Sequence, residues 1–242
     1  MKKSVLEFIG LAKKEQKKLL AILLDPDKLP LEKVAERMAL INKNEVDLLF
    51  VGGSLLFTNI LDQLIVQIKK HTSIPVILFP GNAMQISNKA DGILFLSLLS
   101  GRNPDFLIGN QVVAAPILKQ TNIEILSTSY LLIESGRETT ASYISNTKPI
   151  PRDKPEIAMA TALAGNMMGH QLVYLDGGSG AQNRVPDSTI QQISKTIDTP
   201  IIVGGGIRNK AELEAVYKAG ATIVVVGTAF ENDKAMINDL RN

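Results

Sequence analysis

The amino-acid sequence predicts a (β/α)8 barrel that forms a single domain over residues 1–242. Eight short apolar runs alternate with segments of helical spacing, and such continuous runs are typical of parallel strands buried on both faces. The length of 242 residues matches the roughly 250 residues of such a barrel. Glycine motifs follow the last two runs, where these barrels commonly bind phosphate. A doubly wound open sheet is the alternative.

The first half of the chain carries four of the predicted strands. They are expected over residues 19–24, 47–51, 75–79 and 92–98. The helices are expected over residues 2–18, 31–43, 55–70 and 104–119. The interval between the third and fourth strands is only about ten residues, which is short for a crossover helix. The third unit of the barrel is therefore predicted to be reduced.

The second half completes the alternation. Its strands are expected over residues 124–133, 172–176, 200–204 and 222–227. Its helices are expected over residues 154–168, 186–197, 209–219 and 230–240. Between the fifth strand and the next helix, the polar stretch 135–152 has no clear period. A long loop of this kind in a compact domain is more often a lid or a binding loop than a linker.

Composition excludes several classes of function. The net charge of +2, with nearly equal acidic and basic residues, does not indicate a nucleic-acid partner. The chain has no cysteine and only two histidines, so thiolate chemistry is excluded and a histidine-rich zinc site is not expected. No run reaches the ~20 apolar residues of a membrane span, and the charged N-terminal stretch differs from an apolar leader. The sequence predicts a soluble, cytoplasmic protein.

The stretch Tyr174–Ala181 is the central functional signal, because an apolar strand delivers a carboxylate and then opens into a glycine loop. The segments 201–209 and 223–230 are also β-branched runs that end in glycine and precede helices. Backbone N–H groups left uncovered in such loops bind phosphate. The sequence therefore predicts a phosphorylated small molecule at these three strand ends.

Two side chains of the sixth strand are candidates for catalysis. Tyr174 and Asp176 point to the same side because side chains alternate along a strand. Asp176 could act as a general base toward a bound hydroxyl or orient that hydroxyl by hydrogen bonding. A carboxylate that only caps the next loop is the alternative, which the glycines at 177, 178 and 180 disfavour.

A metal site is suggested at the ends of the first two strands. Asp25 directly follows the first strand, although Asp-Pro is also an ordinary turn opener. Ser54 follows two glycines after the second strand. One carboxylate and one hydroxyl are too few to enclose calcium, but magnesium takes one or two protein oxygens together with waters and substrate phosphates. The pair is consistent with a magnesium–diphosphate contact.

Other residues have a functional and a structural interpretation. Asn82, Arg102 and Arg137 could bind a second anionic group, or they could be solvated loop residues, which we favour for Arg137. The aliphatic residues around 93–118 could line an apolar groove, and packing of the barrel and its helices explains most of them equally well. The lysines of the N-terminal stretch could touch an anionic membrane, but a solvated helix face is favoured.

The chain resembles the geranylgeranylglyceryl phosphate synthase family, which includes the bacterial heptaprenylglyceryl phosphate synthases. The motifs that carry the resemblance occur in the family's order and span nearly the whole chain. They are LLDPDK at 23–28, VGGS at 51–54, LFPGN at 78–82, SLLSGRNP at 97–104, YLDGGSGA at 174–181, IIVGGGIRN at 201–209 and VVVGTAFE at 224–231.

The resemblance implies a prenyltransferase that joins sn-glycerol 1-phosphate to a long prenyl diphosphate, with Mg2+ as cofactor. It also implies a barrel in which less regular chain replaces the helix that would follow the third strand. Asp25 and Ser54 would bind the metal, and Tyr174 and Asp176 would serve catalysis. The residues implied to hold glycerol 1-phosphate are Tyr174, Leu175, Asp176, Gly177, Gly178, Ser179, Gly180, Gly204, Gly205, Gly227 and Thr228.

The sequence departs from the family pattern at three places. Asp176 stands where the family usually has glutamate, and the stretch 135–152 lacks the family's glycine-rich pattern. Leu23 stands where one branch has lysine. With the chain length, this indicates the longer archaeal-type branch, which implies a geranylgeranyl donor, a homo-oligomer and at most a transient contact with a membrane surface. The alternatives are a barrel isomerase or lyase of a phosphorylated metabolite and a non-catalytic phosphate-binding barrel.

Overall fold

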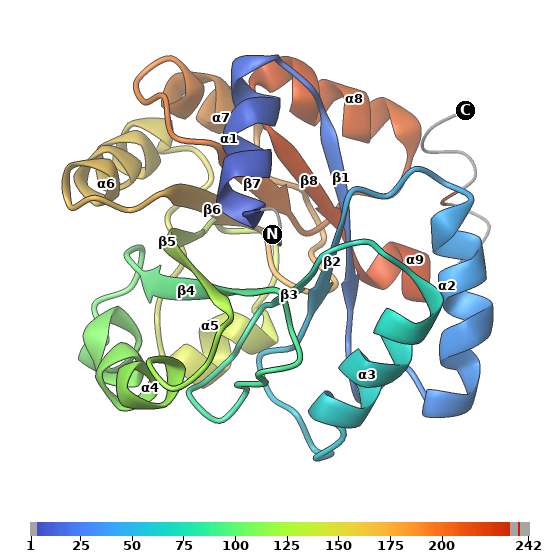
Figure 1. Cartoon of the computed structure of the whole chain (residues 1–242). Coiled ribbons are helices and arrows are strands. Elements are labelled where there is room, and N and C mark those ends of the chain that lie inside the picture. The colour runs from blue at the N-terminus through green and yellow to red at the C-terminus, as the bar shows by residue number, and fades with distance from the viewer. Residues whose placement is uncertain (1–3, 233–236, 238–242) are drawn as a thin grey trace.

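The computed structural model describes residues 4–232 and 237, and it contains a closed barrel of eight parallel strands in sequence order (Figure 1). The strands are β1 (Leu19–Leu24), β2 (Leu48–Val51), β3 (Val76–Leu78), β4 (Gly92–Leu98), β5 (Glu124–Leu132), β6 (Leu172–Asp176), β7 (Ile201–Gly204) and β8 (Ile223–Val226). Because β8 pairs with β1, the sheet closes, which confirms the predicted barrel and excludes the open sheet.

Helices surround the barrel (Figure 1). The described helices are α1 (Val5–Lys14), α2 (Val34–Asn42), α3 (Leu61–His71), α4 (Asn110–Leu118), α5 (Thr140–Ser145), α6 (Pro155–Met167), α7 (Asp187–Ser194), α8 (Lys210–Ala219) and α9 (Thr228–Asn232). A 3-10 turn over Leu31–Lys33 precedes α2, and a π-helical turn over Asp105–Gly109 precedes α4. None of the described helices combines the length and the apolar character needed to cross a bilayer. Most of the helix predicted over 230–240 lies outside the described residues.

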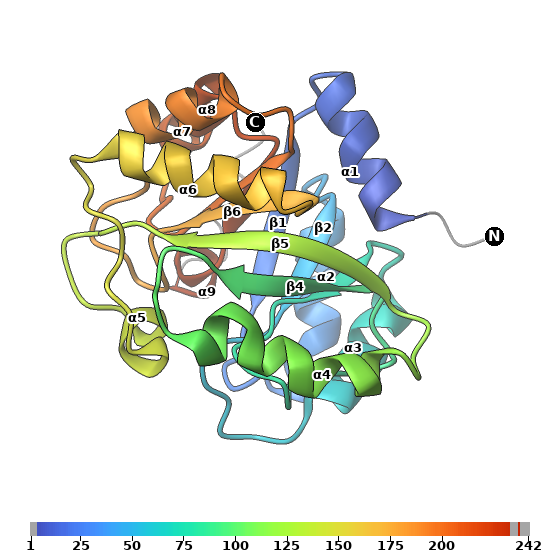
Figure 2. The ribbon, with the colours of Figure 1, turned by 90° about the vertical axis from the view of Figure 1, so that its left-hand side faces the viewer.

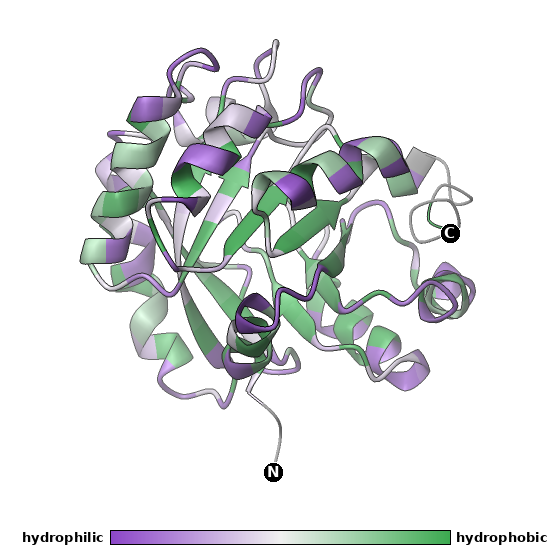
Figure 3. Cartoon of the chain, turned by 90° about the horizontal axis from the view of Figure 1, so that it is seen from above, coloured by the Kyte–Doolittle hydropathy of each residue, from purple (hydrophilic) through white to green (hydrophobic). Residues whose placement is uncertain are grey.

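The strands form the centre of two apolar layers, and Figure 3 shows them as the most hydrophobic part of the ribbon. In β8, Ile223 and Val225 face the barrel interior, whereas Val224 and Val226 face the surrounding helices. All four side chains are buried. This double burial explains why the strands read as continuous apolar runs rather than as alternating ones.

The third unit of the barrel is reduced, as predicted. The chain from residue 79 to residue 91, between β3 and β4, contains no helix and passes between α3 and α4 (Figure 1). The outer face of the neighbouring strand β4 therefore lacks a covering helix from this unit.

The helix predicted over residues 55–70 starts later than expected. The predicted start was wrong, because α3 begins at Leu61 rather than near residue 55. The preceding segment is held by Asp27, whose carboxylate accepts hydrogen bonds from the backbone N–H groups of Phe57 at 2.8 Å and Thr58 at 3.0 Å. These two N–H groups are therefore engaged by a side chain from the first loop, and the helix starts only after them.

The stretch 135–152 contains the short helix α5, which the sequence analysis did not predict. The side chain of Thr139 caps its first turn, and Ser142 completes a capping box. The helix ends at Asn146, which has a left-handed backbone with φ of 48°. A helix of 6 residues is too short to show a hydrophobic period, so only its capping residues could have revealed it.

Helix α1 lies at the end of the barrel where the strands begin (Figure 2). Its buried side chains Val5, Ile9 and Ala12 join the interior cluster of the barrel. Its first turn is anchored by Glu124, the first residue of β5. The carboxylate accepts hydrogen bonds from the Ser4 hydroxyl and the Val5 N–H, both at 2.6 Å. One remote side chain thus supplements the Ser4 cap of the helix and holds the helix against the barrel.

Replacing Glu124 by alanine is expected to lower the free energy of unfolding by about 1–3 kcal/mol, because the first turn of the helix loses a charged hydrogen-bond partner. Amide hydrogen exchange should accelerate in α1 more than in β6 to β8. Glu214→Ala is the control, since within the described part of the chain Glu214 forms only an exposed pair with Lys210 at 3.8 Å. Equal exchange in α1 for both variants would contradict the anchoring role.

Candidate active site

A cavity of about 950 Å³ occupies the mouth of the barrel, at the carboxyl ends of the strands. Loops after β1, β2, β3, β6, β7 and β8 contribute to its wall, together with β4, α4 and α5. Cavities of this size are typical of sites for organic ligands. One side is lined by glycine loops and charged groups and the other by aliphatic side chains, so two chemically different ligands could bind side by side.

Asp176 ends β6, lines the cavity and is buried, with 7% of its surface exposed. Its Oδ1 accepts a hydrogen bond from the Gly178 N–H at 2.7 Å, and its Oδ2 accepts one from the Tyr130 hydroxyl at 2.6 Å. Burial raises the pKa of Asp176 above its ordinary value, and the hydrogen bonds from Tyr130 and Gly178 act in the opposite direction. The side chain is thus a buried carboxylate in a fixed orientation.

Tyr174 lies two residues before Asp176 and also lines the cavity. Its ring stacks on Phe79 with centroids 5.0 Å apart, and Tyr130 meets it edge-on at 5.5 Å. A Cβ atom on Gly204 would lie 2.5 Å from the Tyr174 hydroxyl oxygen, so this position requires glycine. Burial and the charge of Asp176 raise the pKa of Tyr174 well above its ordinary value. The phenol therefore stays neutral.

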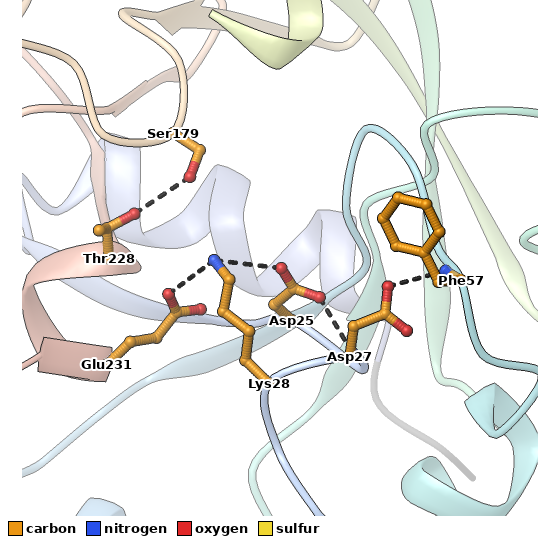
Figure 4. Close-up of polar contacts among 7 residues, drawn as sticks. All are labelled: Asp25, Asp27, Lys28, Phe57, Ser179, Thr228 and Glu231. Carbon is orange, nitrogen blue, oxygen red and sulfur yellow. Dashed lines mark hydrogen bonds and ion pairs between the residues drawn. The ribbon is translucent and has the colours of Figure 1, made fainter.

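The loops after β6 and β7 are in close contact. Gly178 and Gly205 have positive φ values of 88° and 81°, which favour glycine. A Cβ atom on Gly205 would lie 2.8 Å from both the backbone N and O of Gly178, so a side chain would not fit. The Ser179 hydroxyl lies 3.1 Å from that of Thr228 in the loop after β8 (Figure 4). The three predicted loops therefore meet at one place.

Most of the predicted substrate-binding residues line this part of the cavity. Those that do are Tyr174, Asp176, Gly178, Ser179, Gly180, Gly205, Gly227 and Thr228. Leu175 instead points into the layer between the strands and the helices. Gly177 and Gly204 connect the loops, because the Gly177 N–H donates to the Gly204 carbonyl at 3.0 Å. Leu175, Gly177 and Gly204 therefore support the cavity wall without lining it.

The two predicted metal ligands, Asp25 and Ser54, both line the cavity. Oδ1 of Asp25 accepts a hydrogen bond from the Asp27 N–H at 3.0 Å, and Oδ2 lies 3.3 Å from the Lys28 ammonium (Figure 4). The same ammonium pairs with Glu231 at 3.0 Å. Burial lowers the pKa of Lys28, but Glu231 and Asp25 outweigh burial and raise it overall. A permanent cation therefore lies beside Asp25.

The donor set at this rim is made of oxygens only. Among the described residues, no three histidine, aspartate or glutamate side chains gather to enclose a metal ion. One carboxylate and one hydroxyl suit Mg2+, which completes its shell with waters and phosphate oxygens. The two loops lie close together, since a Cβ atom on Gly53 would be in ordinary contact with Oδ1 of Asp25 at 3.8 Å.

The candidate anion-binding residues have different environments. Asn82 lines the cavity, whereas the guanidinium of Arg102 donates to the Leu99 and Gly101 carbonyls, each at 2.8 Å. Arg137 is an exposed loop residue, as favoured from the sequence, and it also lines the cavity with its guanidinium against Gly180. A cation is thus available at the glycine loop.

Several residues of the cavity wall were not predicted from the sequence. Tyr130 and Phe79 reach it from β5 and from the end of β3, and Arg208 reaches it from the loop after β7. The guanidinium of Arg208 donates to the Ala181 carbonyl at 2.7 Å. Its place two residues after the three glycines of the loop was the available signal for Arg208. Tyr130 has no such local signal.

The apolar side of the cavity extends beyond the barrel interior. Leu94 and Leu98 line it from inside the barrel, whereas Ile93 and Phe95 line it from the outer face of β4. The outer face is accessible because no helix covers it from residues 79–91. Further parts of the apolar wall come from Ile86, Leu96, Phe106, Ala114, Ala141 and Ile144. The last two belong to α5, which places the stretch 135–152 at the cavity.

Comparison with known proteins gives a consistent result. A sequence profile described as the PcrB family matches residues 12–242. The chain is 54% identical over 222 residues to a protein of Flavobacterium johnsoniae named geranylgeranylglyceryl phosphate synthase, covering 92% of this chain and 91% of that protein. It is 44% identical over 221 residues to the Pyrococcus furiosus protein of the same name, covering 91% and 87%.

A solved structure agrees over nearly the whole chain. The structure of (S)-3-O-geranylgeranylglyceryl phosphate synthase from Thermoplasma acidophilum, in complex with sn-glycerol-1-phosphate, superimposes with a TM-score of 0.93 at 33% identity. The match covers 99% of this chain and 96% of that one. A tryptophan synthase α-subunit from Pyrococcus furiosus, at 14% identity and a TM-score of 0.58, shares only the fold.

Proposed function

The chain belongs to the PcrB family, and from this membership and its cavity we propose that it forms an ether bond between sn-glycerol 1-phosphate and a long prenyl diphosphate. The observation that carries the proposal is one cavity with two unlike sides. The glycine loops and Asp176 suit a small phosphorylated alcohol, and the aliphatic side suits a prenyl chain. An isomerase or lyase of a small phosphate would not need the second side.

Glycerol 1-phosphate is assigned to the loops after β6, β7 and β8. The close contact of Gly178 with Gly205 keeps this wall free of side chains, so backbone N–H groups can approach a phosphate. The hydroxyls of Ser179 and Thr228 add donors, and Arg137 adds a positive charge. With its phosphate there, the glycerol would reach toward Tyr174 and Asp176.

The prenyl diphosphate is assigned to the rest of the cavity, with its chain along β4 and its diphosphate near Asp25. Asp25 and Ser54 would hold Mg2+, and the ammonium of Lys28 offers the diphosphate a second positive charge. Magnesium would neutralise charge on the leaving diphosphate. This assignment is supported by the oxygen-only donor set and by the position of both residues on the cavity wall.

The proposed reaction exchanges one C–O bond for another. The bond between C1 of the prenyl group and the diphosphate oxygen breaks, and the electron pair leaves with diphosphate. The 3-hydroxyl oxygen of glycerol 1-phosphate attacks the allylic carbon, and its proton passes to the carboxylate of Asp176. Tyr174 lines the glycerol side of the cavity as an uncharged phenol. The aliphatic side chains exclude water, which would otherwise capture the allylic cation.

Three further properties remain predictions. We propose geranylgeranyl diphosphate as the donor, a cytoplasmic location and a homo-oligomer. The exposed residues Ile108, Val112 and Ile117 on and beside α4 support self-association. A transient membrane contact during lipid release is supported by Phe57 and Met84, which are 85% and 91% exposed near the cavity mouth.

The test is a synthesis assay with labelled glycerol 1-phosphate, Mg2+ and a mixture of prenyl diphosphates, followed by mass analysis of the lipid product. We expect a phospho-ether that carries the geranylgeranyl group. The enantiomer sn-glycerol 3-phosphate and excess chelator are the controls, and both should reduce product. Absence of any organic-soluble phospho-ether would contradict the proposed function, and binding of glycerol 1-phosphate without turnover would favour a non-catalytic barrel.

A further inference from the structure

Tyr130 is a buried polar residue of the cavity that the proposed mechanism does not use. It lies on β5, with 9% of its surface exposed, and its hydroxyl donates to Oδ2 of Asp176 at 2.6 Å. A hydrogen bond between a neutral donor and a carboxylate is about twice as strong as one between neutral groups. The contact therefore bears directly on the group that would accept the proton.

The strand register explains why Tyr130 can reach Asp176. Tyr130 pairs with Tyr174, and Leu132 pairs with Asp176, so the carboxylate lies two residues nearer the cavity mouth than the tyrosine backbone. Residues two apart share a face of the sheet and lie about 6.6 Å apart along the strand. A phenol is long enough to span that offset, and shorter hydroxyl side chains are not.

Neighbouring rings fix the direction of the Tyr130 hydroxyl. Its ring meets Phe79 edge-on at 5.8 Å and Tyr174 edge-on at 5.5 Å. Such edge-to-face pairs are a preferred arrangement of aromatic rings. Phe79 and Tyr174 stack on each other, and the Tyr130 ring packs edge-on against both of them, so rotation away from Asp176 would break both contacts.

Among the described residues, each carboxylate oxygen of Asp176 has one hydrogen-bond partner. The Gly178 N–H binds Oδ1 and the Tyr130 hydroxyl binds Oδ2. A carboxylate offers about four lone-pair sites, so acceptor capacity remains for a substrate hydroxyl. One partner comes from β5 and the other from the loop after β6, and they act on different oxygens, so together they fix the rotation of the carboxyl group.

We propose that Tyr130 is a positioning residue that holds Oδ2 of Asp176 and so aims the free acceptor sites of the carboxylate at the glycerol hydroxyl. The inference rests on the proposed function. The hydroxyl of Tyr130 takes no part in bond making. Its role is to keep a short acidic side chain in one orientation, where a longer one could bend to reach the substrate.

The same hydrogen bond influences the charge of Asp176. Two ionisable side chains face it within the described chain, Tyr130 from β5 and Tyr174 from β6, while β7 contributes the backbone of Gly204 and Gly205. Burial and Asp176 raise the pKa of Tyr130 well above its ordinary value, so it remains a donor. Removing this donor removes a contribution that lowers the pKa of Asp176. The acid limb of the pH–rate profile should then move to higher pH.

The test compares Tyr130→Phe with Tyr217→Phe. Both lose one tyrosine hydroxyl, but that of Tyr217 donates to the Leu19 carbonyl at 2.8 Å, at the opposite end of the barrel. For Tyr130→Phe we expect kcat to fall about tenfold to a hundredfold, as for a lost hydrogen bond to a charged group. The KM for glycerol 1-phosphate should change by no more than about twofold. Tyr217→Phe should keep the kcat and the pH profile of the wild type.

Two further measurements separate this inference from the proposed function. In the Asp176→Asn background, Tyr130→Phe should have little additional effect on turnover, because the pair acts as a unit. Carbon NMR of labelled aspartate carboxyls, assigned with Asp176→Asn, reports the titration of Asp176 without any turnover. We expect its midpoint to rise in Tyr130→Phe.

An unchanged NMR midpoint together with an unchanged kcat would overturn the inference. A rise of KM alone would also overturn it, since that result assigns Tyr130 to substrate binding or packing. A third outcome is that the wild type makes no ether but the NMR midpoint of Asp176 still rises in Tyr130→Phe. The proposed function then fails, while the hydrogen bond from Tyr130 to Asp176 is supported. Circular dichroism of each variant confirms that the barrel is folded.

Discussion

Replacing Asp176 by asparagine is expected to reduce turnover by roughly a hundredfold to ten-thousandfold, the range for loss of a general base. The amide keeps the shape of the side chain, and its oxygen can still accept the Gly178 N–H, so the glycine loops should stay in place. The affinity for glycerol 1-phosphate should therefore change little. Calorimetric titration with glycerol 1-phosphate and the rate of labelled ether formation measure the two quantities separately.

Stability provides an independent readout of the same substitution. Burial raises the pKa of Asp176, so the folded state binds a proton at this position more tightly than the unfolded state. The ionised carboxylate therefore destabilises the fold above its folded-state pKa, and this cost disappears as pH falls below the unfolded-state pKa. The asparagine variant should melt at a higher temperature than the wild type at neutral pH, and the difference should shrink on acidification.

Asp198→Asn is the matched control, because Asp198 is exposed in the loop before β7, at the opposite end of the barrel. It should leave turnover and melting near wild-type values. Full activity of Asp176→Asn would show that the carboxylate is not the proton acceptor. A parallel loss of glycerol 1-phosphate binding would instead assign Asp176 to binding the substrate.

Replacing Asp25 by alanine is expected to reduce ether synthesis by roughly a hundredfold or more and to make the residual rate insensitive to Mg2+. The physical reason is that charge neutralisation of a leaving diphosphate by a metal contributes several kcal/mol. Asp25 is the only carboxylate in the proposed ligand pair with Ser54, and the ammonium of Lys28 beside it is a single charge. The rate as a function of Mg2+ concentration is the measurement.

Asp25→Asn is the second variant, because it can retain the hydrogen bond from the Asp27 N–H that shapes the first loop. Binding of Mn2+ in the presence of inorganic diphosphate, followed by electron paramagnetic resonance, tests the metal site without turnover. Both variants should weaken it, and Asp198→Ala should not. Wild-type magnesium dependence in Asp25→Ala would remove Asp25 from the metal site.

Much of the architecture follows from the sequence because its causes are local. Strands buried on both faces must be continuously apolar, so eight such runs with helices between them predict a closed parallel sheet. In a parallel barrel every strand ends at the same rim, so residues directly after strands meet there. That rule places Asp25, Ser54 and Asp176 at one cavity without knowledge of any side-chain contact.

The features that sequence analysis missed depend on contacts between distant parts of the chain. Tyr130 precedes Asp176 by 46 residues, and only the register of β5 against β6 brings them together. The late start of α3 depends on Asp27, which lies 30 residues before Phe57. The hydrophobic period within a short window of sequence predicts neither of these two contacts.

The reduced third unit has a consequence for how this protein completes its own packing. A barrel normally covers the outer face of each strand with a helix from the same chain, whereas here Ile93 and Phe95 face the cavity. A prenyl chain lying along β4 would fill the layer that protein fills in the other units. The bound donor would then complete the apolar packing around β4. Release of the lipid product would expose this apolar surface again at the end of each turnover.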